Sequence, residues 1–143
     1  MNVLFLCTGN YYRSRFAEEY FNSKAREKGI LHRASSRGLA ENFERHKNPG
    51  PMSLDALSEL RRCGVIMRRP IRKPQRLSDA EVPHFDIIIC MDKKEHQPMV
   101  KKWLSLRDKA VIYWNIKDLI DIPASIALPE CRRKIDLLIQ NLA

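Results

Sequence analysis

A cysteine, an arginine and a serine stand close together near the start of the chain, in the segment Cys7-Thr8-Gly9-Asn10-Tyr11-Tyr12-Arg13-Ser14. An apolar run precedes this segment and a helical pattern follows it, so the segment is expected to join a strand to a helix. Successive backbone N–H groups in such a turn can face one point and form an anion-binding nest. The guanidinium of Arg13 adds a planar fork that matches two phosphate oxygens. We therefore interpret residues 7–14 as a phosphate loop.

The cysteine of the phosphate loop has the chemistry of a nucleophile. The positive field of the nest should favour the thiolate of Cys7, and Ser14 can donate a hydrogen bond to the sulfur. Gly9 lets the backbone approach an anion, and Asn10 can tie the loop through its side chain and tolerates left-handed dihedral angles. The alternative is that Cys7 is a core thiol and Arg13 a solvated residue. The position between a strand and a helix favours the phosphate loop.

Alternating strand and helix patterns must position this loop. Continuous apolar runs predict strands over 3–7, 85–91 and 111–116, and a weaker strand covers 32–38. Helical spacing follows the loop up to Gly29, and a second helix begins after Ser53 and ends at Gly64. Strands that alternate with helices predict an α/β fold with a parallel sheet and helices on both faces. We expect one domain over residues 1–143.

The remaining segments complete this pattern. Asp92 and Glu95 have the spacing of a capping box for a third helix. The final helix carries an apolar face made of Cys131, Ile135, Leu138 and Leu142. Residues 40–51 are expected to form a loop, and the basic, proline-punctuated residues 66–76 a surface connection.

Composition limits the classes of partner. The chain has 143 residues, and its 26 Lys and Arg against 17 Asp and Glu give a formal net charge of +9. A positive field favours phosphorylated substrates, nucleic acid or a membrane surface.

No apolar run approaches the roughly 18 residues of a membrane helix. The short apolar opening lacks the basic region of a signal peptide, so we expect a cytoplasmic protein. No cysteine spacing suggests zinc, and four free thiols are expected.

The phosphate loop and its setting resemble those of the low-molecular-weight protein tyrosine phosphatase family. The resemblance covers nearly the whole chain and rests on Cys-x-Gly-Asn-x-x-Arg-Ser at 7–14. It implies a three-layer fold around a four-stranded parallel sheet, and no metal or cofactor. It also implies hydrolysis of phosphate monoesters, protein phosphotyrosine above all, through a phosphocysteine intermediate. Cys7 would then be the nucleophile and Arg13 the phosphate clamp. The substrate-binding residues would be the others of the loop: Thr8, Gly9, Asn10, Tyr11, Tyr12 and Ser14.

Phosphate transfer to a cysteine also needs a general acid that protonates the departing oxygen. In the family this residue is an aspartate that follows the last strand and usually precedes proline. Two aspartates compete for the role, since Asp118 lies closer to the strand end and Asp121 lies closer to Pro123. We favour Asp118, because active sites gather at the carboxyl ends of parallel strands.

Three departures from the family pattern bear on specificity. Tyr12 stands where many members carry a second cysteine, which excludes a protective disulfide from that position. Leu119 and Ile120 replace the proline and aromatic residues that usually follow the acid. Tyr11 stands where many relatives carry a small or aliphatic residue, and its bulky ring could reshape the pocket. Phe43 and His46 could supply another wall of the pocket.

Other functions remain open at this point. Arsenate reductases share the fold and the loop, but their chemistry needs two further cysteines that relay a disulfide outward. A nucleic-acid-binding module would use the basic stretch around residues 61–76, which lacks the interleaved aromatic residues of a single-strand platform. A phosphate-binding protein without catalysis is a third possibility. We expect a phosphorylated protein, a small aryl phosphate and inorganic phosphate as partners, and neither a membrane nor nucleic acid.

Overall fold

A computed structural model of the chain describes residues 1–43 and 48–143. Its sheet contains four parallel strands in the order β2-β1-β3-β4: β1 (Asn2–Cys7), β2 (Arg33–Gly38), β3 (Ile87–Cys90) and β4 (Val111–Tyr113). The helices are α1 (Arg13–Glu27), α2 (Leu54–Arg62), α3 (Lys93–Val100) and α4 (Ala124–Leu142), with short 3₁₀ helices η2 (Asp79–His84) and η3 (Leu104–Leu106).

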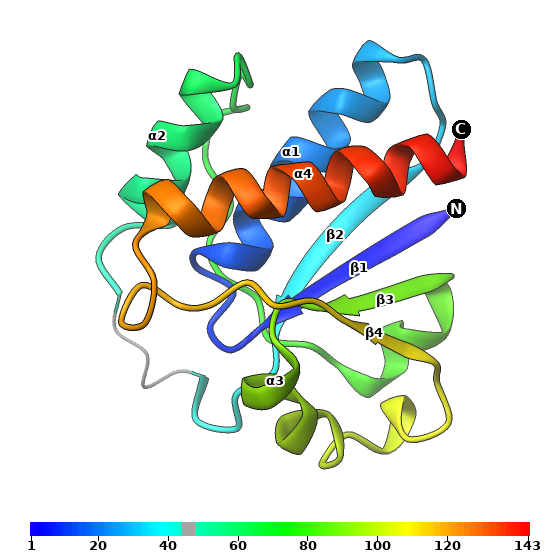
Figure 1. Ribbon diagram of the computed structural model, residues 1–143. Helices are drawn as coiled ribbons and strands as arrows, with labels where there is room; N and C mark the ends of the chain where they lie inside the picture. Colours follow the sequence, from blue (N-terminus) through cyan, green and yellow to red (C-terminus); the bar gives the residue numbers. More distant parts are fainter. Residues whose placement is uncertain (44–47) are drawn as a thin grey trace.

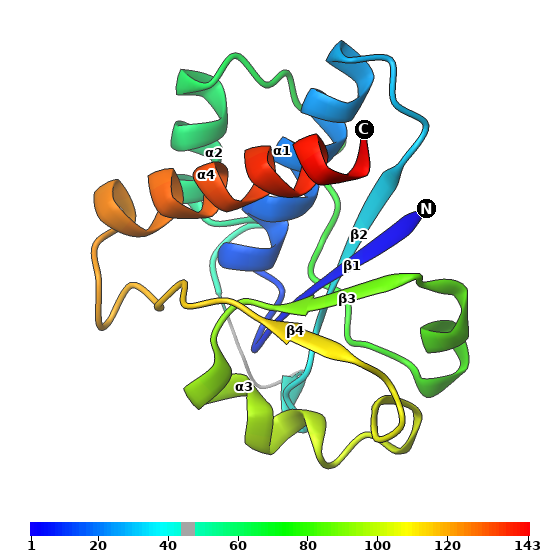
Figure 2. The same ribbon diagram turned by 45° about the vertical axis from the view of Figure 1, so that its right-hand side comes forward.

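The helices cover both faces of the sheet. Helices α1, α2 and α4 lie over one face, and α3 lies over the other (Figures 1 and 2). The three-layer fold with a four-stranded parallel sheet is therefore confirmed. None of the helices in the described part of the chain combines the length and the apolar character that crossing a membrane requires.

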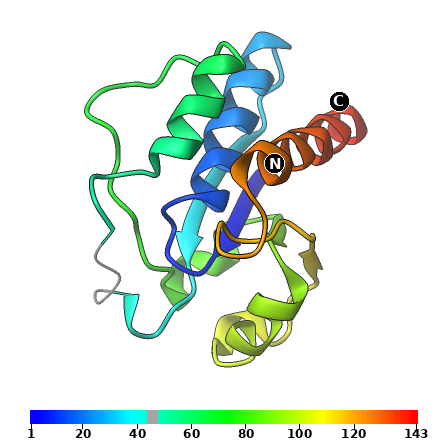
Figure 3. The same ribbon diagram turned by 60° about the vertical axis from the view of Figure 1, so that its left-hand side comes forward.

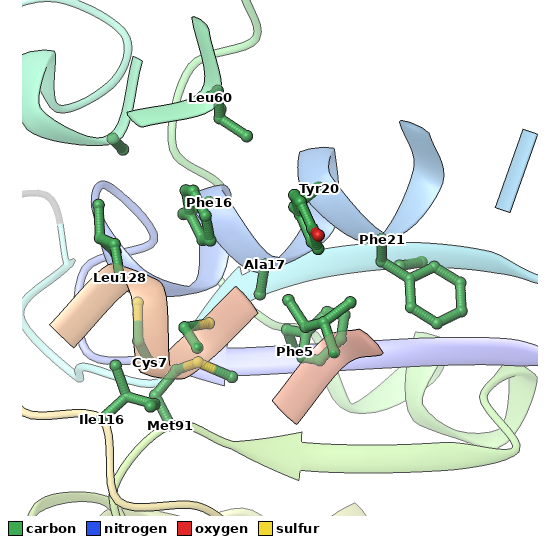
Figure 4. Packing of buried hydrophobic residues seen from close by; sticks show 14 of the residues in the cluster. Phe5, Cys7, Phe16, Ala17, Tyr20, Phe21, Leu60, Met91, Ile116 and Leu128 are labelled. Carbon is green, nitrogen blue, oxygen red and sulfur yellow. The ribbon is translucent and has the colours of Figure 1, made fainter. Parts of the chain in front are cut away.

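Strand β1 is central and its side chains are buried on both faces of the sheet. On the side of α1 and α4, Phe5 packs against Phe21 and Trp114, with ring centroids 6.1 and 5.7 Å away. On the other side, Leu4 and Leu6 join a second apolar cluster. Figure 4 shows Cys7 at the border of the first cluster. Close packing on both faces thus fixes the point at which the nucleophile candidate leaves the sheet.

The predicted start of α2 and the predicted ends of α1 and α2 are confirmed. Ser53 Oγ accepts a hydrogen bond from the backbone N–H of Ala56 at 3.4 Å, as an N-cap does. Gly29 and Gly64 have φ values of 68° and 78°, in the left-handed region that glycine adopts without steric cost. These two glycines therefore end α1 and α2 where the pattern placed the ends.

Strand β4 is shorter than the predicted strand over 111–116. The chain leaves regular pairing after Tyr113, but Trp114 N still donates to Cys90 O at 2.9 Å and Ile116 N to Met91 O at 2.7 Å. Residues 114–116 therefore follow the end of β3 without forming a ladder. This path brings the backbone of Ile116 next to the phosphate loop.

Candidate active site

The phosphate loop connects β1 to α1, as expected (Figure 3). Cys7 is only 3% exposed, and its Sγ lies 2.9 Å from Ser14 Oγ. Asn10 Nδ2 donates to the same Ser14 oxygen at 2.8 Å. Because this oxygen already accepts a hydrogen bond, the Ser14 hydroxyl is free to donate to the sulfur. The expected contact between Ser14 and Cys7 is confirmed.

Asn10 holds the shape of the loop. It has a φ of 51°, it is fully buried, and its Nδ2 also donates to Ser36 Oγ at 2.8 Å. Its Oδ1 accepts from Gln75 N at 3.0 Å and from Arg72 Nη1 at 3.2 Å. Both expectations for Asn10, a left-handed backbone and side-chain ties, are confirmed.

Residues 66–76 do more than connect two elements across the surface, and in this respect the prediction is corrected. Arg72 Nη2 donates to Glu18 Oε1 at 2.8 Å, and the same oxygen accepts from Ser36 Oγ at 2.7 Å. Burial lowers the pKa of Arg72, while the charge of Glu18 acts in the opposite direction. Arg72 was missed because an arginine in a basic, irregular stretch is usually solvated. Its guanidinium instead donates to Asn10 Oδ1 and so helps to hold the loop.

A close approach of backbone and ring explains the glycine at the end of β2. A Cβ atom at Gly38 would lie 2.6 Å from a ring carbon of Phe43 and 2.8 Å from Thr8 O. Leu39 N and Ala40 N donate to the carbonyls of Cys7 and Thr8. The absence of a side chain at Gly38 therefore lets this segment pack directly against the start of the loop.

Arg13 lies at the other end of the loop, and its guanidinium is held along one edge. Nη1 and Nη2 donate to the two carboxylate oxygens of Glu95 at 3.0 and 2.7 Å, and Nη1 also donates to Ile116 O at 3.0 Å. Burial works to lower the pKa of Arg13, but the hydrogen bond with Glu95 and the charge of Cys7 outweigh it and raise the pKa.

These contacts use three of the five N–H bonds of the guanidinium. The Nε–H and one Nη2–H have no partner in the part of the chain that the structure describes. These two bonds lie on the same side of the planar group, where they can donate in parallel to two phosphate oxygens. The contacts with Glu95 and Ile116 therefore leave a complete binding edge of Arg13 available.

Glu95 is the centre of a polar cluster that the sequence did not indicate. Its Oε2 accepts from the Thr8 hydroxyl and lies 3.1 Å from His96 Nε2. His96 Nδ1 accepts from Asp92 N at 3.0 Å, so the ring proton belongs on Nε2. Burial works to raise the pKa of Glu95, but hydrogen bonds from His96 and Arg13 and the charge of Arg13 lower it far below its usual value. Glu95 is therefore an ionised partner of Arg13.

Only half of the predicted capping box forms. Asp92 accepts a hydrogen bond from Glu95 N at 3.1 Å, but the Glu95 carboxylate does not return to the cap and binds Arg13 instead. The position of Glu95 could have been inferred from topology. It lies in the first turn after β3, and β3 pairs with β1, so the carboxyl ends of both strands share one edge of the sheet.

Of the two acid candidates, Asp118 lies near enough to the phosphate loop for its charge to act on Arg13 and Tyr12. Its charge contributes to raising the pKa of Arg13 and, after burial and Asp55, the pKa of Tyr12. Asp118 Oδ1 accepts from Leu119 N at 2.8 Å, and its carbonyl accepts from the backbone of Asp121 in a turn. Asp121 is exposed.

The two tyrosines of the loop have different surroundings. The Tyr11 hydroxyl donates to Pro49 O at 2.5 Å, which ties the loop to the segment before α2. Tyr12 is 5% exposed, and its hydroxyl has no hydrogen-bond partner in the described chain. Phe43 lies against Gly38, at the start of the loop. The expectation for His46 falls outside the described residues.

The four cysteines are free thiols, as expected. Cys90 and Cys131 are fully buried, and burial raises the pKa of both. Cys63 is partly exposed, and Arg132 Nη1 lies 3.3 Å from its sulfur. A disulfide relay of the arsenate-reductase kind requires an accessible attacking thiol, which neither Cys90 nor Cys131 supplies in this fold.

The chain matches the family model of the low molecular weight phosphotyrosine protein phosphatases over residues 2–114. It belongs to this family. The match includes the phosphate loop and Glu95 but ends before the segment that carries Asp118 and Asp121. No curated protein matches the chain.

Solved structures of similar proteins share the phosphatase fold. YfkJ from Bacillus subtilis has a TM-score of 0.83 and 20% identity, with 99% of this chain and 94% of YfkJ covered. The low molecular weight protein tyrosine phosphatase from T. tengcongensis has a TM-score of 0.80 and 24% identity, with 99% of each chain covered. The arginine phosphatase YwlE from Bacillus subtilis, solved as a variant with a phosphorylated active-site serine, has a TM-score of 0.72 and 21% identity, with coverage of 99% and 93%.

Proposed function

We propose that the chain is a cysteine-dependent phosphatase that hydrolyses phosphate monoesters through a phosphocysteine intermediate. The observation that carries this proposal is the arrangement around the loop. The Cys7 sulfur lies 2.9 Å from the Ser14 hydroxyl, and Arg13 is pinned with a free edge at the other end. Phosphoryl transfer to sulfur requires a nucleophile and a group that stabilises the charge on the phosphate oxygens, and the two ends of this strand–helix turn supply both.

In the proposed reaction, the Cys7 thiolate attacks phosphorus while the bond from phosphorus to the leaving oxygen breaks. Asp118 gives its proton to that oxygen, and the Arg13 edge and the loop N–H groups stabilise the charge on the remaining oxygens. Water then attacks the phosphocysteine and gives a proton to Asp118. Inorganic phosphate leaves, and the Cys7 thiolate is restored.

Protein phosphotyrosine is the proposed substrate, because it is the substrate class of the family. The likeness to an arginine phosphatase and the aliphatic Leu119 and Ile120 beside the acid make a direct comparison necessary. Turnover should be measured on an aryl phosphate, a phosphotyrosine peptide and a phosphoarginine peptide of the same sequence. A higher kcat/KM for phosphoarginine than for phosphotyrosine would contradict the proposed substrate class, because the bond broken would be P–N and the leaving atom nitrogen. The phosphocysteine intermediate would not be contradicted.

The nucleophile is tested by Cys7→Ser. This variant should lose aryl-phosphate hydrolysis but still bind inorganic phosphate, because Arg13 and the loop backbone remain. Cys63→Ser is the matched control, since it removes a partly exposed thiol outside the site, and it should keep full activity. Undiminished turnover by Cys7→Ser would refute the proposed phosphatase mechanism.

The acid is tested by Asp118→Asn, with Asp121→Asn as the matched control. Loss of the transferable proton should lower kcat by about 10²–10⁴. The loss should be larger for phenyl phosphate than for nitrophenyl phosphate, whose leaving oxygen needs less help. A leaving-group dependence in Asp121→Asn alone would assign the role to Asp121 instead.

A further inference from the structure

A groove lined by four lysines opens beside the segment that carries the proposed acid. The groove has a volume of about 520 Å³. Lys93 and Lys94 come from the first turn of α3, Lys117 from the segment after β4, and Lys134 from α4. Figures 1 and 3 show the segment after β4 passing between α3 and α4. Three parts of the chain that are distant in sequence thus bring positive charge to one place, which we call the lysine groove.

The charge of the lysine groove is only partly neutralised from within. Asp92 is the one carboxylate among the described residues that line it, and its side chain is buried and bonded to Lys117 Nζ at 2.8 Å. Lys93, Lys94 and Lys134 form no ion pair with another described residue. Lys93 and Lys94 therefore remain available to an anionic partner, and so does Lys134, although Lys134, after Arg133, also helps to lower the pKa of Glu130 on the same helix.

The rest of the groove is lined by aromatic and amide side chains, which can contact a partner without using charge. Tyr113 and Trp114 line it, both only partly buried, and Lys134 Nζ lies 6.0 Å from the centre of the Trp114 ring. Gln97 and Asn115 add amide groups that can donate hydrogen bonds to carboxylate oxygens. Such a wall suits an extended peptide with acidic side chains better than a single small anion.

Lys117 joins the groove to the candidate active site. It lies in the chain between Ile116, whose carbonyl accepts from Arg13, and Asp118, the proposed acid. Neighbouring Cα atoms are about 3.8 Å apart, so the groove begins within a residue or two of the reacting group. A peptide whose phosphorylated residue occupied the phosphate loop would therefore have the groove within reach of its neighbouring residues.

We propose that the lysine groove binds acidic residues that flank the phosphorylated residue of a protein substrate. This inference rests on the proposed phosphatase function and narrows its substrate class to phosphoproteins with Asp- or Glu-rich flanks. Charge complementarity of this kind acts on encounter and binding. The preference should therefore be expressed in KM, with little change in kcat.

The test compares two phosphotyrosine peptides that differ only in having Glu or Gln at the flanking positions. The wild type should show a kcat/KM about tenfold higher for the Glu peptide at low ionic strength, since three partly exposed ion pairs together reach this size. The preference should fall sharply in 0.5 M salt. In a variant that combines Lys93→Gln, Lys94→Gln and Lys134→Gln, the two peptides should differ by less than about twofold. Hydrolysis of nitrophenyl phosphate by this variant should be unchanged.

The net charge of +9 requires a control that removes the same charge elsewhere. Arg26→Gln, Lys28→Gln and Arg33→Gln together remove three exposed charges at the end of α1 and the start of β2, at the opposite edge of the sheet from the phosphate loop. This control variant should keep the preference for the Glu peptide. Loss of the preference in the control as well would overturn the inference, because the whole field of the protein would then be responsible.

The experiment distinguishes a wrong inference about the lysine groove from a wrong proposed function. Equal kcat/KM values for the two peptides, with nitrophenyl phosphate hydrolysis intact, would overturn the inference about the groove alone. Absence of hydrolysis of every phosphate ester by the wild type would overturn the proposed function and the inference together. Groove-dependent binding of a single-stranded oligonucleotide, without a peptide preference, would also overturn the inference and reassign the groove to nucleic acid.

Discussion

Replacing Glu95 by Gln tests how the clamp arginine is held. Gln keeps the length of the side chain and one acceptor oxygen, but it loses the charge and places an N–H₂ group against one guanidinium nitrogen. The side chains of Arg13 and Glu95 are 3% and 27% exposed, so the contact is largely shielded from water. The substitution therefore removes a largely buried ion pair and holds Arg13 less firmly, with the hydrogen bond to Ile116 O remaining.

The size of the effect follows from this geometry. Breaking a fully buried ion pair by changing one partner costs about 3–5 kcal/mol. Since Glu95 is about a quarter exposed and Gln retains one hydrogen bond, we expect a loss of about 1–3 kcal/mol in the free energy of unfolding. A misplaced clamp should lower kcat/KM for nitrophenyl phosphate by about 10–10².

Urea unfolding and steady-state kinetics measure these two effects separately. Glu19→Gln is the matched control, because Glu19 pairs with Arg15 on α1, away from Arg13. This control should leave kcat/KM unchanged. The reasoning would be refuted if Glu95→Gln had a kcat/KM equal to or higher than that of the wild type, or bound inorganic phosphate more tightly. Glu95 would then compete with phosphate for Arg13 instead of positioning it.

Three further predictions concern stability. The pKa of Glu95 is lowered in the folded protein, so its contribution is complete above the unfolded value of about 4.3 and is lost as pH falls through the folded pKa. The difference in unfolding free energy between wild type and Glu95→Gln should thus be constant from pH 5 to 8 and shrink below about pH 4, as urea titrations at each pH would measure. Gly38→Ala should destabilise the protein by about 1–3 kcal/mol in urea unfolding and lower activity, because its methyl group would meet Thr8 O. Tyr12→Phe should leave activity intact and keep or raise the melting temperature, because it removes a buried hydroxyl without a partner in the described chain; a fall of several degrees would contradict this.

The parts of the site that depend on local spacing were predictable from the sequence. The turn from β1 to α1, the contact of Ser14 with Cys7 and the left-handed Asn10 all involve residues within eight positions of each other. Backbone geometry and residue chemistry make such contacts predictable from the local sequence, although distant segments then hold them in place. The alternation of strands and helices then predicted the parallel sheet that carries the loop.

The parts that depend on distant contacts were not predictable in the same way. Glu95 has the sequence signature of a helix cap, and only the pairing of β1 with β3 reveals that its carboxylate faces Arg13. Arg72 lies in the irregular segment 66–76, where no regular spacing of apolar residues predicts the path of the chain. Side chains of this kind are placed by tertiary packing, which overrides local preference.

The hydrogen bonds that hold the Asn10 side chain have a consequence for how the protein unfolds. Its side chain is bonded to Ser36 on β2 and to Arg72 and Gln75 in the long connection, at sequence separations of 26, 62 and 65 residues. The phosphate loop can therefore keep its shape only while these distant segments remain docked. Local fraying of the phosphate loop would break the same hydrogen bonds that join it to these distant segments, so the loop belongs to a large cooperative unit. In hydrogen exchange, the amides of this turn would then open together with the central strands, unlike those of a mobile lid.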